Sequence, residues 1–323
     1  MRRVIGLTLA GLGAFLIVAA VLVRTYVGGQ LIKFPLNEYV KTTLLAKNVS
    51  YFSPALVKPV TGATIRVTDT VKGDAKAGTS STAVWNEFTY LYDVTNHKEY
   101  AVSTRRAAFN RRTAQLVDCC GESVNGNSTI RQTGVSGYVF PLGTQKKTYD
   151  VFDTSLNRPM PFRYVGTGTI DGISVYKFVE KVAPTQAGSQ KIPGTLVGFK
   201  QSMVTLPMMY TATNTYWVDP ATGGVLDTTQ NQRQWLQDSS GTQRLLLFNG
   251  DIVMTPPSVH TAVGLDSTGR NELNWFQNLI PLIAMLTGVV LLAAGVVLIW
   301  LKRRGQPERS DAEEPEPALG PAR

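Results

Sequence analysis

The chain has few residues that could carry catalytic chemistry. Its two histidines are His97, in an Asn-His-Lys turn, and His260, which follows two prolines, and neither has a neighbouring carboxylate motif. Two acid pairs have the composition of a glycosidase site, Asp150 with Asp153 and Glu87 with Asp93. Such pairs are common in chains of this length, and no nucleophile elbow, zinc motif, P-loop or dinucleotide fingerprint is present. We therefore expect a protein that is not an enzyme and has no cofactor.

The two cysteines are adjacent, Cys119 and Cys120. Without a second pair they do not match the ligand spacing of a structural zinc site. They could form a vicinal disulfide in an oxidising compartment, or they could be two neighbouring thiols. We expect the disulfide, because this segment is predicted to lie outside the cytoplasm.

Clustered basic residues are the other candidates for binding chemistry. Arginine side chains match phosphate oxygens bidentately, and lysines attract the same groups as point charges. The alternative interpretation is ordinary solvated charge. The predicted ligand-binding residues are Arg105, Arg106, Arg111, Arg112, Lys146 and Lys147.

The overall charge is consistent with an anionic partner. The 323 residues have a formal charge of +9 at neutral pH. Arg2 and Arg3 contribute two of these charges, while the five basic and five acidic residues of 302–323 cancel. About +7 is left for the middle of the chain, and such a surface suits anionic headgroups or acidic glycolipids. No nucleic-acid-binding module is recognisable, so we expect no nucleic-acid partner.

The elements that would position these residues begin with two apolar segments. Residues 279–301 are long enough to cross a bilayer and have no polar face. Trp275 and Trp300 lie near the ends of this segment, and three basic residues follow it, which predicts a transmembrane helix with a cytoplasmic C-terminal end. Residues 1–24 begin with two arginines and continue with an apolar run. That run is longer than a usual signal core and lacks a small-residue cleavage site, so an uncleaved anchor is favoured over a signal peptide.

These segments predict a two-pass plasma-membrane protein with both termini in the cytoplasm. Residues 25–278 would form one extracytoplasmic domain, and residues 302–323 a disordered cytoplasmic tail.

The middle of the chain has the pattern of an all-β domain. Short runs of β-branched and aromatic residues recur about every ten residues, with turn residues between them. Asn125-Gly126 and Asp171-Gly172 are hairpin signals. We predict a short helix over Asn37–Ala46 and a loop over Ala183–Gly194. The expected class is mainly β (α+β), an antiparallel sheet between two terminal transmembrane helices.

Several short motifs together resemble an actinobacterial membrane-protein family labelled the PorA family. The resemblance is carried by residues 1–6, Asp118-Cys119-Cys120-Gly121-Glu122, residues 140–149, Phe152-Asp153, and residues 163–172. It implies an envelope protein, and members have been linked to the maturation of lipomannan and lipoarabinomannan. The family supplies no established catalytic residues.

Topology, charge and resemblance together predict a non-enzymatic envelope protein that binds or transfers a membrane lipid or lipoglycan during lipoglycan assembly. Envelope biosynthesis proteins would be further partners, and the oligomeric state is left open. The alternatives are an enzyme acting on envelope glycolipids and a scaffold for a glycosyltransferase complex.

Overall fold

The computed structural model describes residues 2–27 and 32–303, which divide into two compact units. One unit joins residues 1–31 with 274–323, and the other, the β domain, is residues 32–273. The helices are α1 (Arg2–Leu22), the π-helical turn η1 (Val23–Val27), the 3-10 turn η2 (Gly194–Val197), α3 (Pro256–Asn274), the π-helical turn η3 (Trp275–Leu279) and α4 (Ile280–Arg303). The strands are β1 (Tyr39–Ser53), β2 (Lys58–Gly73), β3 (Thr82–Asp93), β4 (Lys98–Asn110), β5 (Ser123–Val124), β6 (Tyr149–Asp153), β7 (Arg158–Ile170), β8 (Ile173–Pro193), β9 (Met203–Val218), β10 (Val225–Gln237) and β11 (Gln243–Met254).

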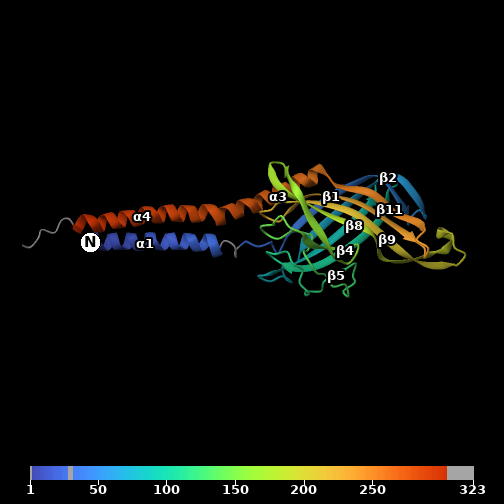
Figure 1. The fold of residues 1–323 in the computed structure, drawn as a ribbon, viewed down its shortest axis with the longest axis horizontal. Helices are drawn as coiled ribbons and strands as arrows, with labels where there is room; N and C mark the ends of the chain where they lie inside the picture. The colour runs from blue at the N-terminus through green and yellow to red at the C-terminus, as the bar shows by residue number, and fades with distance from the viewer. Residues whose placement is uncertain (1, 28–31, 304–323) are drawn as a thin grey trace, which may run out of the picture. The chain divides into compact units, whose positions relative to one another are not determined.

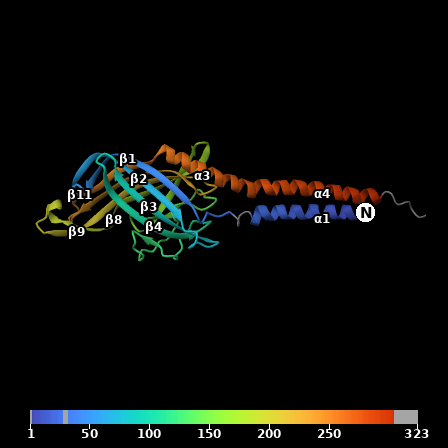
Figure 2. The same cartoon turned by 180° about the vertical axis from the view of Figure 1, so that it is seen from behind.

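The β domain is built on one eleven-stranded sheet in the order β5-β4-β3-β2-β1-β11-β10-β9-β8-β7-β6. All paired strands are antiparallel, and most are neighbours in the chain. The exception is β1, which pairs with β11 from the other end of the domain. The sheet curls around an interior (Figure 1), and the view from behind shows β1 to β4 as one continuous wall (Figure 2). The expectation of an antiparallel, mainly β chain with apolar helices near both ends is confirmed.

The segment after β4 connects the two ends of the curl. Leu116 pairs with Phe109 of β4, and its neighbour Gln115 pairs with Val135. Val135 then pairs with Val151 of β6. The backbone N–H of Val135 also donates to the carbonyl O of Asp150 in β6 at 2.7 Å. Backbone pairing therefore continues from β4 to β6, although these strands lie at opposite ends of the sheet.

Apolar side chains fill much of the interior. One cluster joins β3 and β4 to β6, β7, β8 and β9, and its largest buried members are Trp85, Phe109, Phe140, Phe162 and Phe178. A second cluster joins β1, β2 and β11. Tyr100 of β4 stacks on Phe248 of β11 with ring centroids 5.9 Å apart. Three strands separate β4 from β11 in the sheet, so this contact crosses the concave side and shows how tightly the sheet curls.

Both predicted hairpin signals are confirmed. Asn125 and Gly126 have φ values of 51° and 75°, and Asp171 and Gly172 have φ values of 44° and 82°. Positive φ at both central residues is the requirement of the type I′ turn, whose twist matches that of the flanking strands.

Two local predictions were wrong. Asn37–Ala46 is not helical, because β1 begins at Tyr39 and pairs with β2 and β11 on its two sides. The predicted loop Ala183–Gly194 is the second half of β8, which runs to Pro193 and pairs with β9. In both cases hydrogen bonds to neighbouring strands satisfy the backbone, and this pairing overrides local propensity.

Helices α1 and α4 pack as an antiparallel pair through glycines. A Cβ at Gly13 would lie 2.5 Å from the backbone N of Leu292 and 2.6 Å from the carbonyl O of Gly288. A Cβ at Gly295 would lie 2.6 Å from the carbonyl O of Gly6. The two helices therefore touch backbone to backbone, as small residues permit in membrane-spanning pairs.

Helix α3 packs on the β domain through apolar and polar contacts. Val263 belongs to a buried cluster with Val175 of β8 and Leu226 of β10. Arg270 donates to Oδ2 of Asp219, in the turn after β9, at 2.7 Å. Asp266 accepts a hydrogen bond from Thr222 in the same turn, so that α3 is tied to the β9–β10 connection.

Candidate functional site

Ionisable side chains form a belt on the inner face of the curled sheet. Side chains two residues apart on a strand share a face of the sheet. Each of these ionisable residues either is buried itself or lies two residues from an apolar residue that belongs to the first interior cluster or packs against it. We call this set the inner belt. Its members are Asp69 of β2, Glu87 of β3, Arg105 of β4, Asp153 of β6 and Glu180 of β8.

Arg105 is the cation of the inner belt and is held by the segment that closes the curl. Its Nε donates to Oε1 of Gln132 at 2.8 Å, and its Nη1 donates to the carbonyl O of Ser136 at 2.8 Å. The guanidinium lies 4.7 Å from the ring centroid of Tyr138 and 5.1 Å from that of Phe152. Its Nη2 has no hydrogen-bond partner among the described residues, and only 6% of the residue is exposed. These contacts fix the charge of Arg105 inside the domain.

Asp69 and Glu87 form the first acid pair of the belt. Burial raises the pKa of Asp69 to about 8, and repulsion from Glu87 adds to the rise. Burial also raises the pKa of Glu87, whereas the nearby charge of Arg105 acts in the opposite direction. Glu87 and Arg105 face each other on neighbouring strands. One positive charge therefore serves two carboxyl groups, which favours a proton on one of them at neutral pH.

Asp153 and Glu180 form the second acid pair. Asn214 donates to Oε2 of Glu180 at 2.6 Å, and a side-chain hydrogen bond joins Glu180 to Asp153. Asp153 also accepts two backbone N–H groups on Oδ1. Burial raises the pKa of Glu180 to about 7, and repulsion from Asp153 contributes. Burial raises the pKa of Asp153 too.

Tyr216 of β9 links the two acid pairs. Burial is the main cause of its raised pKa, and the charges of Glu180 and Glu87 are the next contributors. Glu87 belongs to β3 and Glu180 to β8, on opposite arms of the curl. The belt is therefore one electrostatic environment across the interior.

The inner belt has the chemistry of a cation-attracting, proton-exchanging lining. The belt contains four carboxyl groups and one guanidinium, so it becomes net negative as the carboxyls ionise. Among residues 2–27 and 32–303, no group of three or more acidic, histidine or cysteine side chains is arranged to hold a metal ion.

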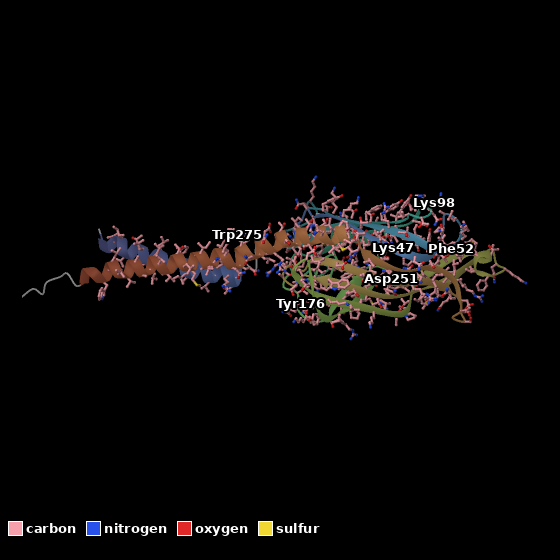
Figure 3. All side chains as sticks on the ribbon, turned by 90° about the horizontal axis from the view of Figure 1, so that it is seen from above. Lys47, Phe52, Lys98, Tyr176, Asp251 and Trp275 are labelled. Carbon is pink, nitrogen blue, oxygen red and sulfur yellow. A yellow bond between two sulfur atoms is a disulfide. The ribbon has the colours of Figure 1, made fainter. Side chains whose placement is uncertain are left out.

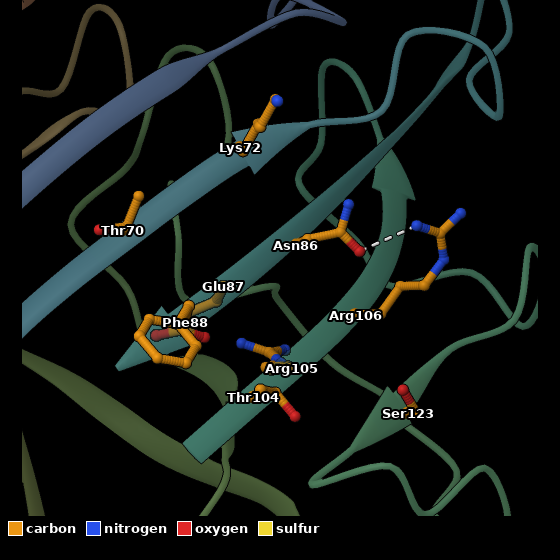
Figure 4. A pocket seen from close by; sticks show the side chains of 9 residues that line it. All are labelled: Thr70, Lys72, Asn86, Glu87, Phe88, Thr104, Arg105, Arg106 and Ser123. Atoms are coloured by element: carbon orange, nitrogen blue, oxygen red, sulfur yellow. Dashed lines mark hydrogen bonds between the residues drawn. The ribbon is translucent and has the colours of Figure 1, made fainter. Parts of the chain in front are cut away.

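A pocket of about 470 Å³ lies at the strands that carry Glu87 and Arg105 (Figure 4). Each of the three guanidinium nitrogens of Arg106, one of its lining residues, donates a hydrogen bond within the chain. Its Nη2 pairs with Oδ2 of Asp74 at 3.0 Å, Nη1 donates to Asn86 at 2.9 Å, and Nε donates to the carbonyl O of Cys120 at 2.8 Å. The pocket is lined by Thr70, Lys72, Asn86, Glu87, Phe88, Thr104, Arg105, Arg106 and Ser123.

The structure does not bring the six predicted basic residues into one patch. Arg105 is internal, and Arg106 lines the outer pocket. Arg111 donates to the carbonyl O of Phe34 at 2.6 Å, so it holds the segment before β1. The Nε of Arg112 is buried without a partner among the described residues.

The two predicted lysines lie on the loop before β6. Lys146 lies over the rings of Tyr164 and Tyr176, and Lys147 lies over Tyr149. Ligand binding by the six basic residues stays a prediction.

The remaining sequence candidates are also dispersed. Cys119 and Cys120 are joined by a disulfide in the structure. Asp150 is exposed while Asp153, three residues later on β6, contributes to the interior. Asp93 accepts a hydrogen bond from Tyr51 at 2.5 Å, at the opposite end of β3 from the pocket. Asp150 and Asp153 therefore differ in exposure, and Glu87 and Asp93 lie six residues apart on β3.

Sequence reasoning missed Asp69 and Glu180. Their signal is an acidic residue that alternates with apolar ones, as in Phe178-x-Glu180-x-Val182, where period-two alternation predicts an inward side chain.

The helices and the β domain together define a class of protein. Two apolar helices meet the length and composition of membrane spans, Val4–Tyr26 and a segment within Pro256–Trp300. Between them lies a β domain with an ionisable interior. These features are those of a membrane protein with helical spans and a β-rich body.

The family model described as porin PorA matches residues 5–297, so the chain belongs to the porin PorA family. A porin PorA of Corynebacterium resistens is 45% identical over 49 residues, which cover 15% of this chain and 12% of the relative. A porin PorA of Corynebacterium amycolatum is 34% identical over 89 residues, covering 24% of this chain and 23% of the relative. The chain thus spans under a quarter of the length of the curated relatives it matches.

These comparisons correct the functional expectation. The relatives are described as porins, a channel-forming and non-enzymatic class, and not as lipid-transfer or lipoglycan-assembly proteins. The prediction of lipid or lipoglycan binding was therefore wrong, as were its two glycolipid-centred alternatives. The prediction failed because the net positive charge was interpreted as a surface that binds lipid headgroups. Arg105, Arg106 and Arg111 are in fact occupied by contacts within the chain.

Proposed function

We propose that this chain is a porin-type protein of the cell envelope that lets small hydrophilic solutes pass, with a preference for cations. The observation that carries the proposal is the inner belt, four carboxyl groups against one guanidinium on the concave side of the curled sheet. Apolar lining would exclude ions, whereas a ring of acidic side chains selects cations.

The spans are helical in this proposal, and the β domain lies in water. Exposed large apolar residues crowd α1 and α4, for example Val4 at 67% and Val290 at 67% exposure. The surface of the β domain instead carries charged side chains, including Lys47 and Lys98 (Figure 3). Lysine at the midplane of a membrane barrel costs about 2–4 kcal/mol. The β domain therefore acts as a polar vestibule outside the hydrocarbon.

The orientation is inferred from charge. Arg2 and Arg3 are the first residues of α1, Lys302 and Arg303 are the last residues of α4, and Arg304 is next in the sequence. Basic residues flanking spans stay in the cytoplasm. The antiparallel pairing of α1 and α4 puts both basic ends at the same end of the pair, which supports cytoplasmic termini and an extracytoplasmic β domain.

Conductance of the purified full-length chain in planar bilayers tests the proposal. We expect discrete current steps with cation preference, growing from pH 6 to pH 9 because an acid with a raised pKa loses its proton as pH rises through that value. The double variant Asp69→Asn/Glu180→Gln should lower the cation-to-anion permeability ratio several-fold. Asp150→Asn, an exposed acid on β6, is the matched control. Absence of steps at any protein concentration, or selectivity equal in all three proteins, would contradict the proposal.

A further inference from the structure

The outer face of β1 to β4 is a surface that the proposed channel does not use. In antiparallel strands, residues directly opposite each other share a face. Phe88 of β3 is adjacent to the inward Glu87, so Phe88 and its cross-strand partners Thr70 and Thr104 face outward. Phe88 is 46% exposed. Exposed apolar surface on a sheet, where it is part of a larger patch, is typical of a binding site.

The strand register places four cross-strand rows on this outer face. They are Tyr39–Lys72–Asn86–Arg106, Lys41–Thr70–Phe88–Thr104, Thr43–Thr68–Tyr90–Val102 and Leu45–Arg66–Tyr92–Glu99. Glu99, at the margin, is the one acidic residue in these rows. We call this surface the basic aromatic face.

Three cations on the basic aromatic face are unpaired. Lys41, Arg66 and Lys72 are exposed, and none makes an ion pair or side-chain hydrogen bond within the part of the chain that the structure describes. Arg106, by contrast, is neutralised by Asp74. The uncompensated charge of this face therefore comes from three side chains that are free to meet an anion.

The aromatic rings share cross-strand rows with two of these cations, since Lys41 lies in the row of Phe88 and Arg66 in the row of Tyr92. Phe88, Tyr90 and Tyr92 occupy alternate positions of β3, and the rings of Tyr90 and Tyr92 are 6.1 Å apart. Aromatic faces carry partial negative charge, which attracts polarised C–H groups such as those of a sugar ring. Hydroxyl and amide groups lie between the rings and the cations, and the pocket of Figure 4 opens beside Phe88 and Lys72.

We propose that the basic aromatic face binds an acidic polysaccharide, a carbohydrate polymer that carries carboxylate groups. Spacing favours a polymer over a single anion. Lys41 and Lys72 lie near one end of the β1–β2 pair, and Arg66 lies six residues from Lys72, about 20 Å along the strand. One headgroup or free anion does not reach both ends, whereas an extended chain with an acid on successive sugars does. The rings of β3 then supply the stacking surface beside the charges.

Binding of the full-length chain, held in a neutral maltoside detergent, to immobilised polygalacturonate tests the proposal. We expect retention that weakens with salt, because exposed ion pairs are screened, and no retention on neutral dextran of similar length. The triple variant Lys41→Gln/Arg66→Gln/Lys72→Gln should weaken binding at least ten-fold. Phe88→Ser/Tyr90→Ser should weaken it several-fold while leaving its salt dependence unchanged, since stacking carries no charge.

A matched control separates a defined face from general basicity. Arg158, Lys181 and Lys191 are exposed on β7 and β8, so Arg158→Gln/Lys181→Gln/Lys191→Gln removes the same charge elsewhere. An equal loss in both triple variants, or no binding to polygalacturonate, would overturn the proposal. So would charge-dependent binding to phosphatidylglycerol vesicles together with no binding to the polysaccharide. Bilayer conductance of the first triple variant should equal that of the parent, which keeps this test independent of the channel.

Discussion

Individual carboxyl groups in the interior set the pH response of the β domain. Glu180 is 1% exposed, and its pKa is raised from an ordinary 4.5 to about 7, chiefly by burial. The folded state holds a proton there that the unfolded state releases. Its contribution to stability is therefore complete below about pH 4.5 and is lost as pH rises towards 7.

Replacement of that carboxyl gives a residue-scale prediction. Glu180→Gln keeps an oxygen to accept the hydrogen bond from Asn214 but cannot ionise. We expect the variant to be more stable than the parent at pH 8, on the order of 2 kcal/mol, with the difference vanishing near pH 4. Thermal unfolding at the two pH values measures it, with Asp150→Asn as control. A difference that is the same at both pH values would rule out ionisation as its cause.

At the scale of elements, backbone contact decides how α1 and α4 pair. Gly13→Leu would place a side chain where the backbone of α4 lies, whereas a Cβ at Gly11 meets nothing within 4 Å. We expect Gly13→Leu to separate the helices and Gly11→Leu to leave them paired. With a protease site inserted after Val27, pull-down of the cleaved first span in mild detergent reports the pairing. Retention of the span in both variants would show that packing is more tolerant than the glycine contacts imply.

Helix α3 is tied to the sheet by a buried charge. Asp219 is fully buried and accepts from Arg270 at 2.7 Å. Arg270→Gln leaves that carboxylate without its countercharge, so we expect amide hydrogen exchange in α3 to rise several-fold, for a cost of about 1–2 kcal/mol given the partial exposure of Arg270. Glu272→Gln, an exposed change on the same helix, is the control.

Burial raises the pKa of Asp266 to about 7, and a hydrogen bond with Asp219 contributes. After correction for the intrinsic rise of amide exchange with pH, the amides of α3 should therefore be better protected at pH 6 than at pH 8.

At the scale of the whole molecule, the proposed topology makes a prediction about access. Lys98 is exposed on the β domain, and Ser310 follows the last basic cluster. A membrane-impermeant maleimide applied to intact cells should label Lys98→Cys and leave Ser310→Cys unlabelled until the cells are opened. The native cysteine pair is bonded and does not react. Labelling of Ser310→Cys alone in intact cells would invert the orientation.

The sequence by itself determined the two apolar spans, the mainly β middle and the type I′ hairpins. These features depend on local information: run length, period-two alternation and the φ preferences of Asn-Gly and Asp-Gly. They could be read without knowing which strands pair.

Only the tertiary structure decided the rest. The pairing of β1 with β11, the closure through Val135 and the placement of Glu87 and Glu180 around Tyr216 each join residues that lie far apart in the chain. The same curl buried Arg105 and left Lys41 and Lys72 free, although all three are simply basic residues in the sequence. Which charges face inward and which face solvent depends on strand register, where a shift of one residue exchanges the two faces.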